Sequence, residues 1–339
     1  MYTIFLREHN RIAKELHKIN PNWHDESLFQ ETRKIVMAEF QSITYGEWLP
    51  WLIGKQAMVE YELGPSPSGY SNGYQANVDP RTANDFTAAA FRIFHSLIQD
   101  NIWLDRNGST WGALVDVRAD VVTSGGLQGV IEGMLYQPSQ VQDSHITNQI
   151  KNRMFAQGKL YGTDVISTDI YRGRDHGLPT YNDYREFCGL RRATDWEDFS
   201  DTISQKDIKV LQSLYASHDD VDSYVGAVLE QQKSSLQPAS ITSPTFQCIV
   251  ADQFYRTKFG DPYFFDFNGP SKPFTQAQLQ QIHQRSASKL LCDNIPGLKS
   301  VPRFAFVMLG VNENKEVKCA ELPILDLSHW GDDFSFDNS

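Results

Sequence analysis

The chain has 339 residues, of which 40% are hydrophobic and 22% charged, so it is a globular protein large enough to bury a substantial core. Its formal net charge of -11 argues against nucleic acid and anionic membranes as main partners, because both attract basic surfaces. No apolar run reaches the length of a membrane span, and the N-terminal sequence MYTIFLREHNR lacks the long apolar region of an export signal.

The first part of the chain shows helical periodicity. Residues 3–20 predict an amphipathic helix, because apolar side chains recur along one side. Asp25 is a suitable N-cap for a second helix that is expected to run to about Thr44. The segment 64–74, GPSPSGYSNGY, is rich in glycine, proline and serine and therefore predicts a loop.

The stretch from Asp79 to Leu104 predicts one long amphipathic helix. Asp79 is a good N-cap, Pro80 suits the first helical position, and apolar residues follow at helical spacing. His95 lies near the centre of this stretch on a mostly apolar surface. Such a histidine is commonly a hydrogen-bonded core residue, and the functional alternative is a metal or haem ligand. Both interpretations stay open on this stretch alone.

Later segments extend the helical pattern. Residues 125–138 and 145–158 predict further helices, and Thr275 can cap a helix that runs to about Cys292. Convincing strands are few, and neither an internal repeat nor a long linker divides the chain. The expected architecture is one mainly α-helical domain over residues 1–339.

The segment from Asp169 to Pro179 reads as a compact charged loop. Its Arg-Gly-Arg-Asp-His sequence would suit an anion clamp, although a charged loop is often only solvated. Asn107-Gly108-Ser109 is an N-glycosylation sequon, a pattern that also arises by chance. All four cysteines lie in the second half of the chain.

Several motifs then occur in order along nearly the whole chain. They are LREHNR at 6–11, NPNW at 20–23, ITY at 43–45 with LP at 49–50, VDPR at 78–81, FRIFHSLI at 91–98, RGRDHGLP at 172–179, FCGL at 187–190 and LCDN at 291–294. The sequence resembles the animal haem peroxidase family. This resemblance implies a mainly α-helical fold around haem b and the oxidation of halide, phenol or tyrosine-type donors by hydrogen peroxide.

The resemblance also implies roles for particular residues. His95 matches the axial ligand of the haem iron, and Arg92 and Arg172 match contacts to the haem propionates, with structural salt bridges as the alternative. Asp169 stands where the family usually has asparagine, whose side chain bonds the far nitrogen of the axial histidine. A carboxylate there would increase electron donation to iron and lower its reduction potential. His176 is expected to brace its loop rather than to act in catalysis.

The cysteines fit the same resemblance. It implies a disulfide between Cys188 and Cys248 and another between Cys292 and Cys319, with four free thiols as the alternative. Two disulfides indicate an oxidising compartment, and the family implies secretion. In a secreted protein, the sequon predicts an N-glycan at Asn107.

The family pattern places Met1 inside the family domain. The distal histidine and arginine, the calcium site and the acidic residues that form ester bonds to haem are therefore expected outside this chain. The LREHNR motif is expected to be a structural helix and not the distal pair. Three interpretations follow: part of a secreted peroxidase, a short haem-binding form without peroxidase turnover, or an adhesive or matrix protein that reuses the fold. The sequence contains no heptad repeat, so it does not predict association through a coiled coil.

Overall fold

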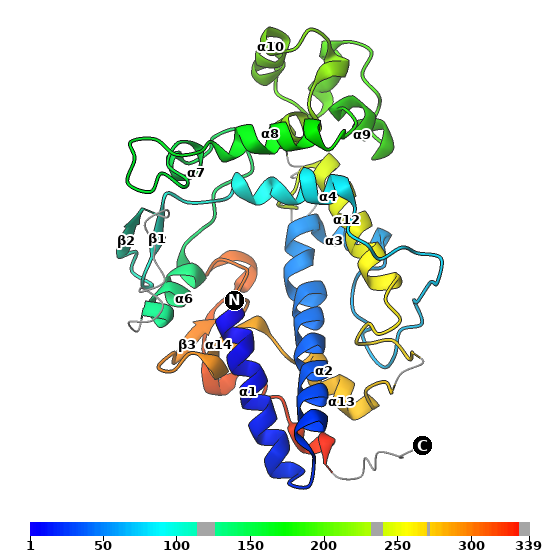
Figure 1. The fold of residues 1–339 in the computed structure, drawn as a ribbon, viewed down its shortest axis with the longest axis vertical. Helices are drawn as coiled ribbons and strands as arrows, with labels where there is room; N and C mark the ends of the chain where they lie inside the picture. The colour runs from blue at the N-terminus through cyan, green and yellow to red at the C-terminus, as the bar shows by residue number, and fades with distance from the viewer. Residues whose placement is uncertain (114–125, 232–239, 270–271, 332–339) are drawn as a thin grey trace.

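Helices dominate the computed structural model, which describes residues 1–113, 126–231, 240–269 and 272–331 (Figure 1). The α-helices are α1 (Tyr2–Ile19), α2 (Asp25–Ile43), α3 (Leu49–Glu60), α4 (Asn84–Ala88), α6 (Leu127–Tyr136), α7 (Asn148–Lys151), α8 (Val165–Asp175), α9 (Tyr181–Phe187), α10 (Gln205–Leu214), α11 (Ser223–Leu229), α12 (Pro244–Phe259), α13 (Gln276–His283) and α14 (Ala287–Asn294). Strands β1 (Asn101–Trp103) and β2 (Thr110–Ala113) pair antiparallel, as do β3 (Ser300–Pro302) and β4 (Glu316–Lys318). The predicted mainly α class is confirmed. Within the described ranges, no helix is both long and apolar enough to cross a membrane.

The two N-terminal helices form an antiparallel pair at one end of the molecule (Figure 1). Their predicted extents are confirmed to within a few residues. The turn between them is anchored by Asn20, whose buried side chain donates a hydrogen bond to the Trp330 carbonyl at 2.8 Å. Helix α2 continues through a π-helical turn, Thr44–Trp48, into α3, and together they form the long column in Figure 1.

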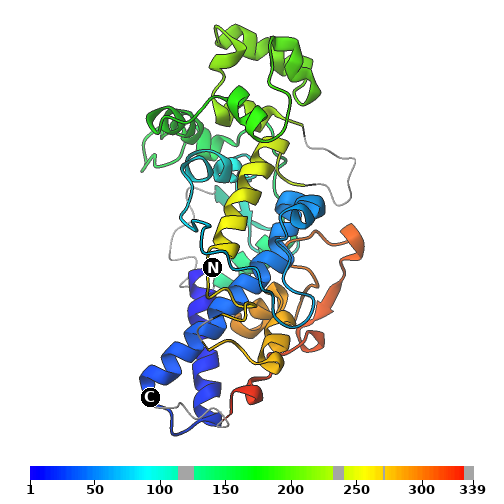
Figure 2. The same cartoon turned by 90° about the vertical axis from the view of Figure 1, so that its right-hand side faces the viewer.

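Helix α12 lies beside α3 in both views (Figures 1 and 2). Helices that are far apart in the sequence therefore share one core. The larger apolar cluster includes Ile12 of α1, Leu52 of α3 and Val250 of α12, all fully buried. A second cluster lies between α1, α14 and β3 and includes Ile4, Leu290 and Val301. Amphipathic helices that bury their apolar sides in this way gain most of their stability from packing rather than from helix propensity.

The single long helix expected from Asp79 to Leu104 is wrong. The structure has the short helix α4, a 3₁₀ segment, Ala90–His95, and then β1. Asp79 caps no helix, because its carboxylate accepts from the side chain and backbone of Arg81. Ala89 lies between the two helical pieces with φ -134° and ψ -68°, which interrupts the helix.

The expected charged loop over residues 169–179 is also wrong, because most of it belongs to α8. Asp164 caps this helix and accepts from the backbone N–H groups of Ile166 and Ser167. The helix tolerates an internal glycine and ends before Gly177, whose φ of +63° is easy for glycine. Asp169 is therefore held on a rigid helix and not on a mobile loop.

Two other predicted helices are shorter than expected. Of the expected helix over 145–158, only α7 is present. Thr275 does cap a helix, but α13 ends at His283, and Ser286 then caps α14 separately. The chain bends between these helices, and the bend places Arg285 in the interior.

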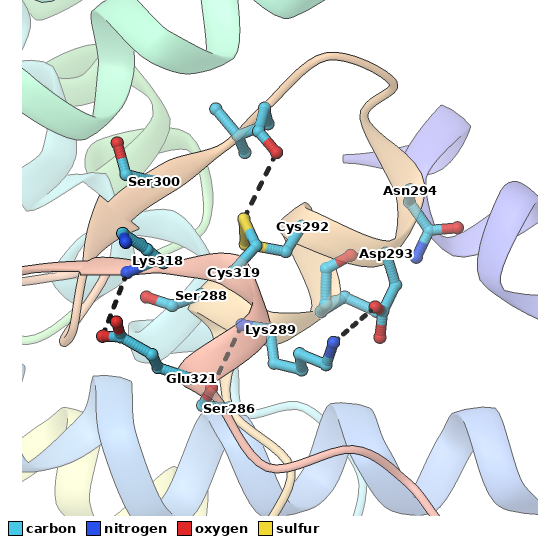
Figure 3. Close-up of a disulfide and its surroundings, with 12 residues drawn as sticks. Ser286, Ser288, Lys289, Cys292, Asp293, Asn294, Ser300, Lys318, Cys319 and Glu321 are labelled. Carbon is cyan, nitrogen blue, oxygen red and sulfur yellow. Dashed lines mark hydrogen bonds and ion pairs between the residues drawn. A yellow bond between two sulfur atoms is a disulfide. The ribbon is translucent and has the colours of Figure 1, made fainter.

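Both disulfides join the predicted cysteines. One links Cys188, after α9, to Cys248 in α12, and the other links Cys292 in α14 to Cys319 (Figure 3). The bridged residues are 60 and 27 positions apart in the sequence. In the chain-entropy model, loops of these lengths stabilise the fold by about 4 and about 3.5 kcal/mol.

Buried charges hold α1, α2 and the bend after α13 together. Arg285 donates to Glu8 of α1 at 2.6 Å and to Asp293 at 2.6 Å, and its Nε lies 2.7 Å from the Glu39 carboxylate of α2. Glu8 also accepts from Arg11. The side chains of Arg285, Glu8 and Glu39 are completely inaccessible to solvent. Burial raises the pKa of Glu39, whereas the pKa of Glu8 is lowered because its bonds to Arg11 and Arg285 outweigh burial.

The raised pKa of Glu39 makes the free energy of unfolding depend on pH. Because the folded state holds the Glu39 proton more tightly than the unfolded state, this contribution is complete at acidic pH and is lost as the pH rises through neutrality. We expect Glu39→Gln to remove up to about 1.4 kcal/mol per pH unit from the decline in stability between about pH 5 and pH 8. Urea unfolding of both proteins over this range measures it, and parallel stability curves would contradict the expectation.

Candidate functional site

The site forms where the 3₁₀ segment, Ala90–His95, meets α8. In a 3₁₀ helix, side chains three residues apart lie above one another, so Arg92 and His95 point in the same direction. Both reach Asp169 of α8, whose side chain is completely inaccessible to solvent. Arg92 Nη1 donates to Asp169 Oδ1 at 2.8 Å, and His95 Nδ1 bonds the other carboxylate oxygen, Oδ2.

This contact fixes the roles of the two ring nitrogens of His95. A carboxylate oxygen accepts, so Nδ1 is the nitrogen that donates to Asp169, and in a neutral ring Nε2 then keeps its lone pair. Nε2 has no hydrogen-bond partner in the part of the chain that the structure describes, and the side chain is 27% exposed. A histidine whose far nitrogen is held by a carboxylate and whose Nε2 is free has the arrangement of a metal ligand.

The two arginines of the predicted site differ in their surroundings. Arg92 spans the site, because its Nη1 binds Asp169 while its Nε donates to the Thr87 carbonyl at 3.0 Å. Arg172 lies one helical turn after Asp169, is exposed, and makes no hydrogen bond or ion pair with any described residue. Arg92 therefore braces the carboxylate, and Arg172 is a cation available to an anionic group.

The other charged side chains of the RGRDH motif act within the fold. Arg174 pairs with Asp222 at 2.7 Å. His176 Nδ1 bonds Asn84 Oδ1 at 2.6 Å, and Asn84 in turn donates to the His176 carbonyl. The motif thus joins the end of α8 to the start of α4. His176 braces α8 against α4 and not a loop of its own, and α4 leads directly into the 3₁₀ segment that carries Arg92 and His95.

Sequence reasoning missed Tyr224 of α11, which is only 2% exposed. Burial raises the pKa of its phenol, the Asp169 charge raises it further, and the Arg92 charge opposes the shift. The hydroxyl has no hydrogen-bond partner among the described residues. No motif singles out this tyrosine, because it lies in a segment of short helices and turns whose packing on α8 only the fold reveals.

The LREHNR motif lies in α1 and makes contacts with neighbouring helices. Glu8 and Arg11 belong to the buried charge network, and Arg7 donates to the Asn294 carbonyl at 2.9 Å. The His9 ring lies 5.4 Å from that of Phe29. These contacts join α1 to its neighbouring helices and have no part in the His95 site.

Across the described ranges, no three or more histidine, cysteine, aspartate or glutamate side chains gather as a metal site. The site offers one histidine nitrogen, and Arg172 follows Asp169 by one turn on the same helix. A single histidine nitrogen suits a metal group that brings its other ligands with it. Haem is such a group, because its porphyrin nitrogens also bind the iron.

The chain is similar to known proteins over almost its whole length. The sequence model of the family described as "Animal haem peroxidase" matches residues 1–306. A protein named "Peroxidase" from Drosophila melanogaster is 41% identical over 98% of this chain and 49% of its own length. Human eosinophil peroxidase is 34% identical over 97% of this chain and 46% of its own length. The chain belongs to the animal haem peroxidase family, and it spans about half the length of each of these two relatives.

Solved structures share the fold. Peroxidase A from Dictyostelium discoideum aligns with a TM-score of 0.69 at 27% identity over 86% of this chain and 53% of its own. A fatty acid alpha-dioxygenase from Oryza sativa aligns with a TM-score of 0.72, but at 18% identity, over 91% of this chain and 57% of its own. The second likeness concerns the fold alone.

Proposed function

We propose that this chain forms the histidine side of the haem site of a peroxidase, in which His95 would ligate the iron of haem b. The observation that carries the proposal is the buried Asp169 carboxylate between His95 Nδ1 and Arg92, which leaves Nε2 free on a partly exposed ring. Family membership identifies haem as the group that such a histidine would hold.

Each residue then has a defined task. His95 Nε2 would ligate the iron, while Asp169 would fix the ring and increase its electron donation and Arg92 keeps the carboxylate in place. Arg172, which is free of protein partners in the described ranges, would bind a haem propionate, since a guanidinium fork matches a carboxylate. Haem, when bound, supplies the redox-active iron at which peroxide is reduced.

The proposed reaction reduces hydrogen peroxide to water with two electrons from a halide, phenol or tyrosine-type donor. Because the chain spans about half of its relatives, this activity is proposed for the whole protein. The alternatives are a haem-binding form without turnover and an adhesive protein of the same fold. All three differ in two measurable properties, haem uptake and peroxide-dependent oxidation.

Haem titration of the purified chain tests the ligand. We expect a histidine-ligated Soret spectrum from the wild type and from His176→Ala, whereas His95→Ala loses that spectrum and binds haem about tenfold more weakly or worse. His176 is the matched control because it lies near the site but bonds Asn84. A spectrum unchanged in His95→Ala would reject the ligand, and a folded chain that takes up no haem would favour the adhesive alternative.

A peroxide-driven assay with a phenolic donor separates the two haem-binding proposals. The whole peroxidase should oxidise the donor in proportion to the haem it holds. Haem uptake with a histidine-ligated spectrum but without oxidation by the full-length protein would identify the form without turnover.

We also propose that the chain works in an oxidising, extracellular compartment and carries an N-glycan at Asn107. Its two disulfides support the compartment. Asn107 is exposed in the turn between β1 and β2, where Asp105 accepts from the backbone N–H groups of Asn107 and Ser109. We expect the secreted chain to lose mass after enzymatic deglycosylation, and Asn107→Gln to abolish that loss. An unchanged mass after treatment of the wild type would contradict this.

A further inference from the structure

Ser96, the residue that follows the 3₁₀ segment, is tied by its side chain to a distant part of the chain. It is only 1% exposed, and its hydroxyl donates to the Asp143 carbonyl at 2.8 Å and accepts from the Asp143 backbone N–H at 2.9 Å. The Val141 carbonyl lies 3.2 Å from the same hydroxyl. The carbonyl of the next residue, Leu97, accepts from the Gln140 N–H at 2.9 Å. The proposed function uses none of these contacts.

The segment 140–143 is itself anchored on its other side. These described residues form neither helix nor strand, so their place depends on the hydrogen bonds that they make. The buried Gln142 side chain donates to the Ala227 carbonyl of α11 at 3.1 Å and accepts from the Ser243 N–H at 2.9 Å. Ser243, at the start of α12, also donates to the Ala227 carbonyl, at 2.8 Å. The segment is therefore a bridge from Ser96 to α11.

This bridge closes a ring of contacts around the site. Helix α11 packs on α8, which carries Asp169. His95 and Asp169, which lie 74 positions apart in the sequence, are thus joined both directly and through Ser96, the segment 140–143 and α11. His95 is the last residue of the 3₁₀ segment. Helix ends fray unless contacts outside the helix hold them, and Ser96 supplies such contacts next to His95.

We propose that Ser96 is a positioning residue for His95 and that the segment 140–143 is its anchor. Because the backbone is fixed directly after His95, the imidazole keeps the orientation in which Nδ1 meets Asp169. Without the Ser96 hydroxyl, the end of the 3₁₀ segment moves more freely and the bond between His95 and Asp169 weakens. A metal-binding histidine depends on support of this kind, because its ring must be held in one direction.

The inference rests on the proposed function, because it concerns the residue that would ligate iron. Its test uses the chain without haem, so that failure of haem binding does not affect the result. The readout is the NMR resonance of the His95 Nδ1 proton, which moves upfield as its hydrogen bond to Asp169 weakens. Its rate of exchange with water reports how often that bond opens. A general loss of stability would not move the resonance.

Ser96→Ala removes only the hydroxyl. We expect the His95 Nδ1 proton of this variant to move upfield and to exchange with water about tenfold faster than in the wild type. The matched control is Ser288→Ala, because Ser288 of α14 is equally buried and its hydroxyl donates to the Pro302 carbonyl at 2.7 Å. It should lower the urea midpoint of unfolding but leave the resonance in place. A resonance that stays in place in Ser96→Ala, or that moves equally in Ser288→Ala, would overturn the proposal.

Gln142→Met tests the anchor and leaves the Ser96 hydroxyl intact. Methionine has a similar volume but cannot replace the two bonds of the amide. We expect the His95 resonance to move upfield by less than in Ser96→Ala, because Ser96 keeps its own contacts. If Ser96→Ala does not fold, this variant decides, and an unmoved resonance would reject the proposal. Haem titration of both variants then reports separately on the proposed function, since a chain that takes up no haem still gives the His95 resonance.

Discussion

Arg285→Met is expected to lower the free energy of unfolding by about 3–5 kcal/mol. Removing one partner of a buried ion pair leaves the other charge without compensation in a medium that solvates it poorly. Arg285 faces three carboxyl groups, those of Glu8, Glu39 and Asp293. Methionine fills a similar volume and packs well, so the loss measures charge and not a cavity. Urea unfolding at neutral pH gives the value.

The matched control removes the charges together. Arg285→Met combined with Glu8→Gln and Glu39→Gln leaves fewer buried carboxylates, so it should be more stable than Arg285→Met alone, since coordinated replacement of buried ions is often tolerated. A triple variant no more stable than the single one would show that the network acts through shape rather than charge. A single variant as stable as the wild type would refute its importance.

Asp169→Asn is expected to raise the iron(III)/iron(II) reduction potential of the haem-loaded chain, and Asp169→Ala to weaken haem retention about 10–100-fold. A carboxylate on the far nitrogen of His95 increases donation to iron and so favours iron(III), whereas an amide donates less. Alanine removes the partner altogether and also frees Arg92. Spectroelectrochemistry and haem titration measure the two effects.

Asp175→Asn is the appropriate control for Asp169. It lies at the last residue of the same helix and changes the net charge identically, but it has no contact with His95. Equal potentials for Asp175→Asn and the wild type would show that the effect of Asp169 is local. If the reduction potential of Asp169→Asn is not higher than that of the wild type, the proposed effect of the carboxylate on iron is rejected, even if His95 ligates iron.

Sequence periodicity predicted those helices whose apolar residues recur over several turns. The first two helices are amphipathic over many turns, so periodicity alone located them. The two disulfides came from the family resemblance, because sequence spacing cannot choose among the pairings of four cysteines.

The site itself shows where such patterns fail. Helical spacing over 79–104 is a real feature of the sequence, yet three consecutive alanines, Ala88, Ala89 and Ala90, are buried and the backbone turns at Ala89. Tertiary packing overrides helix propensity there. The α8 helix was missed for the opposite reason, because glycine and many charges mask a segment that the Asp164 cap and its packing make helical.

The burial of Tyr224 near α8 could not be predicted, since it depends on helices that lie far apart in the sequence. The partnership of His95 with Asp169 was expected only through the resemblance. The part played by Arg92 as a brace for Asp169 emerged from the structure.

The 3₁₀ segment has a consequence for how this protein can evolve. With three residues in each turn, one inserted or deleted residue between Arg92 and His95 would rotate one side chain away from the other by about 120°. The pair could then no longer share the two oxygens of Asp169. Substitutions at the intervening positions Ile93 and Phe94 preserve that spacing, whereas changes in length destroy it. The segment should therefore tolerate substitutions at these positions but keep a fixed length.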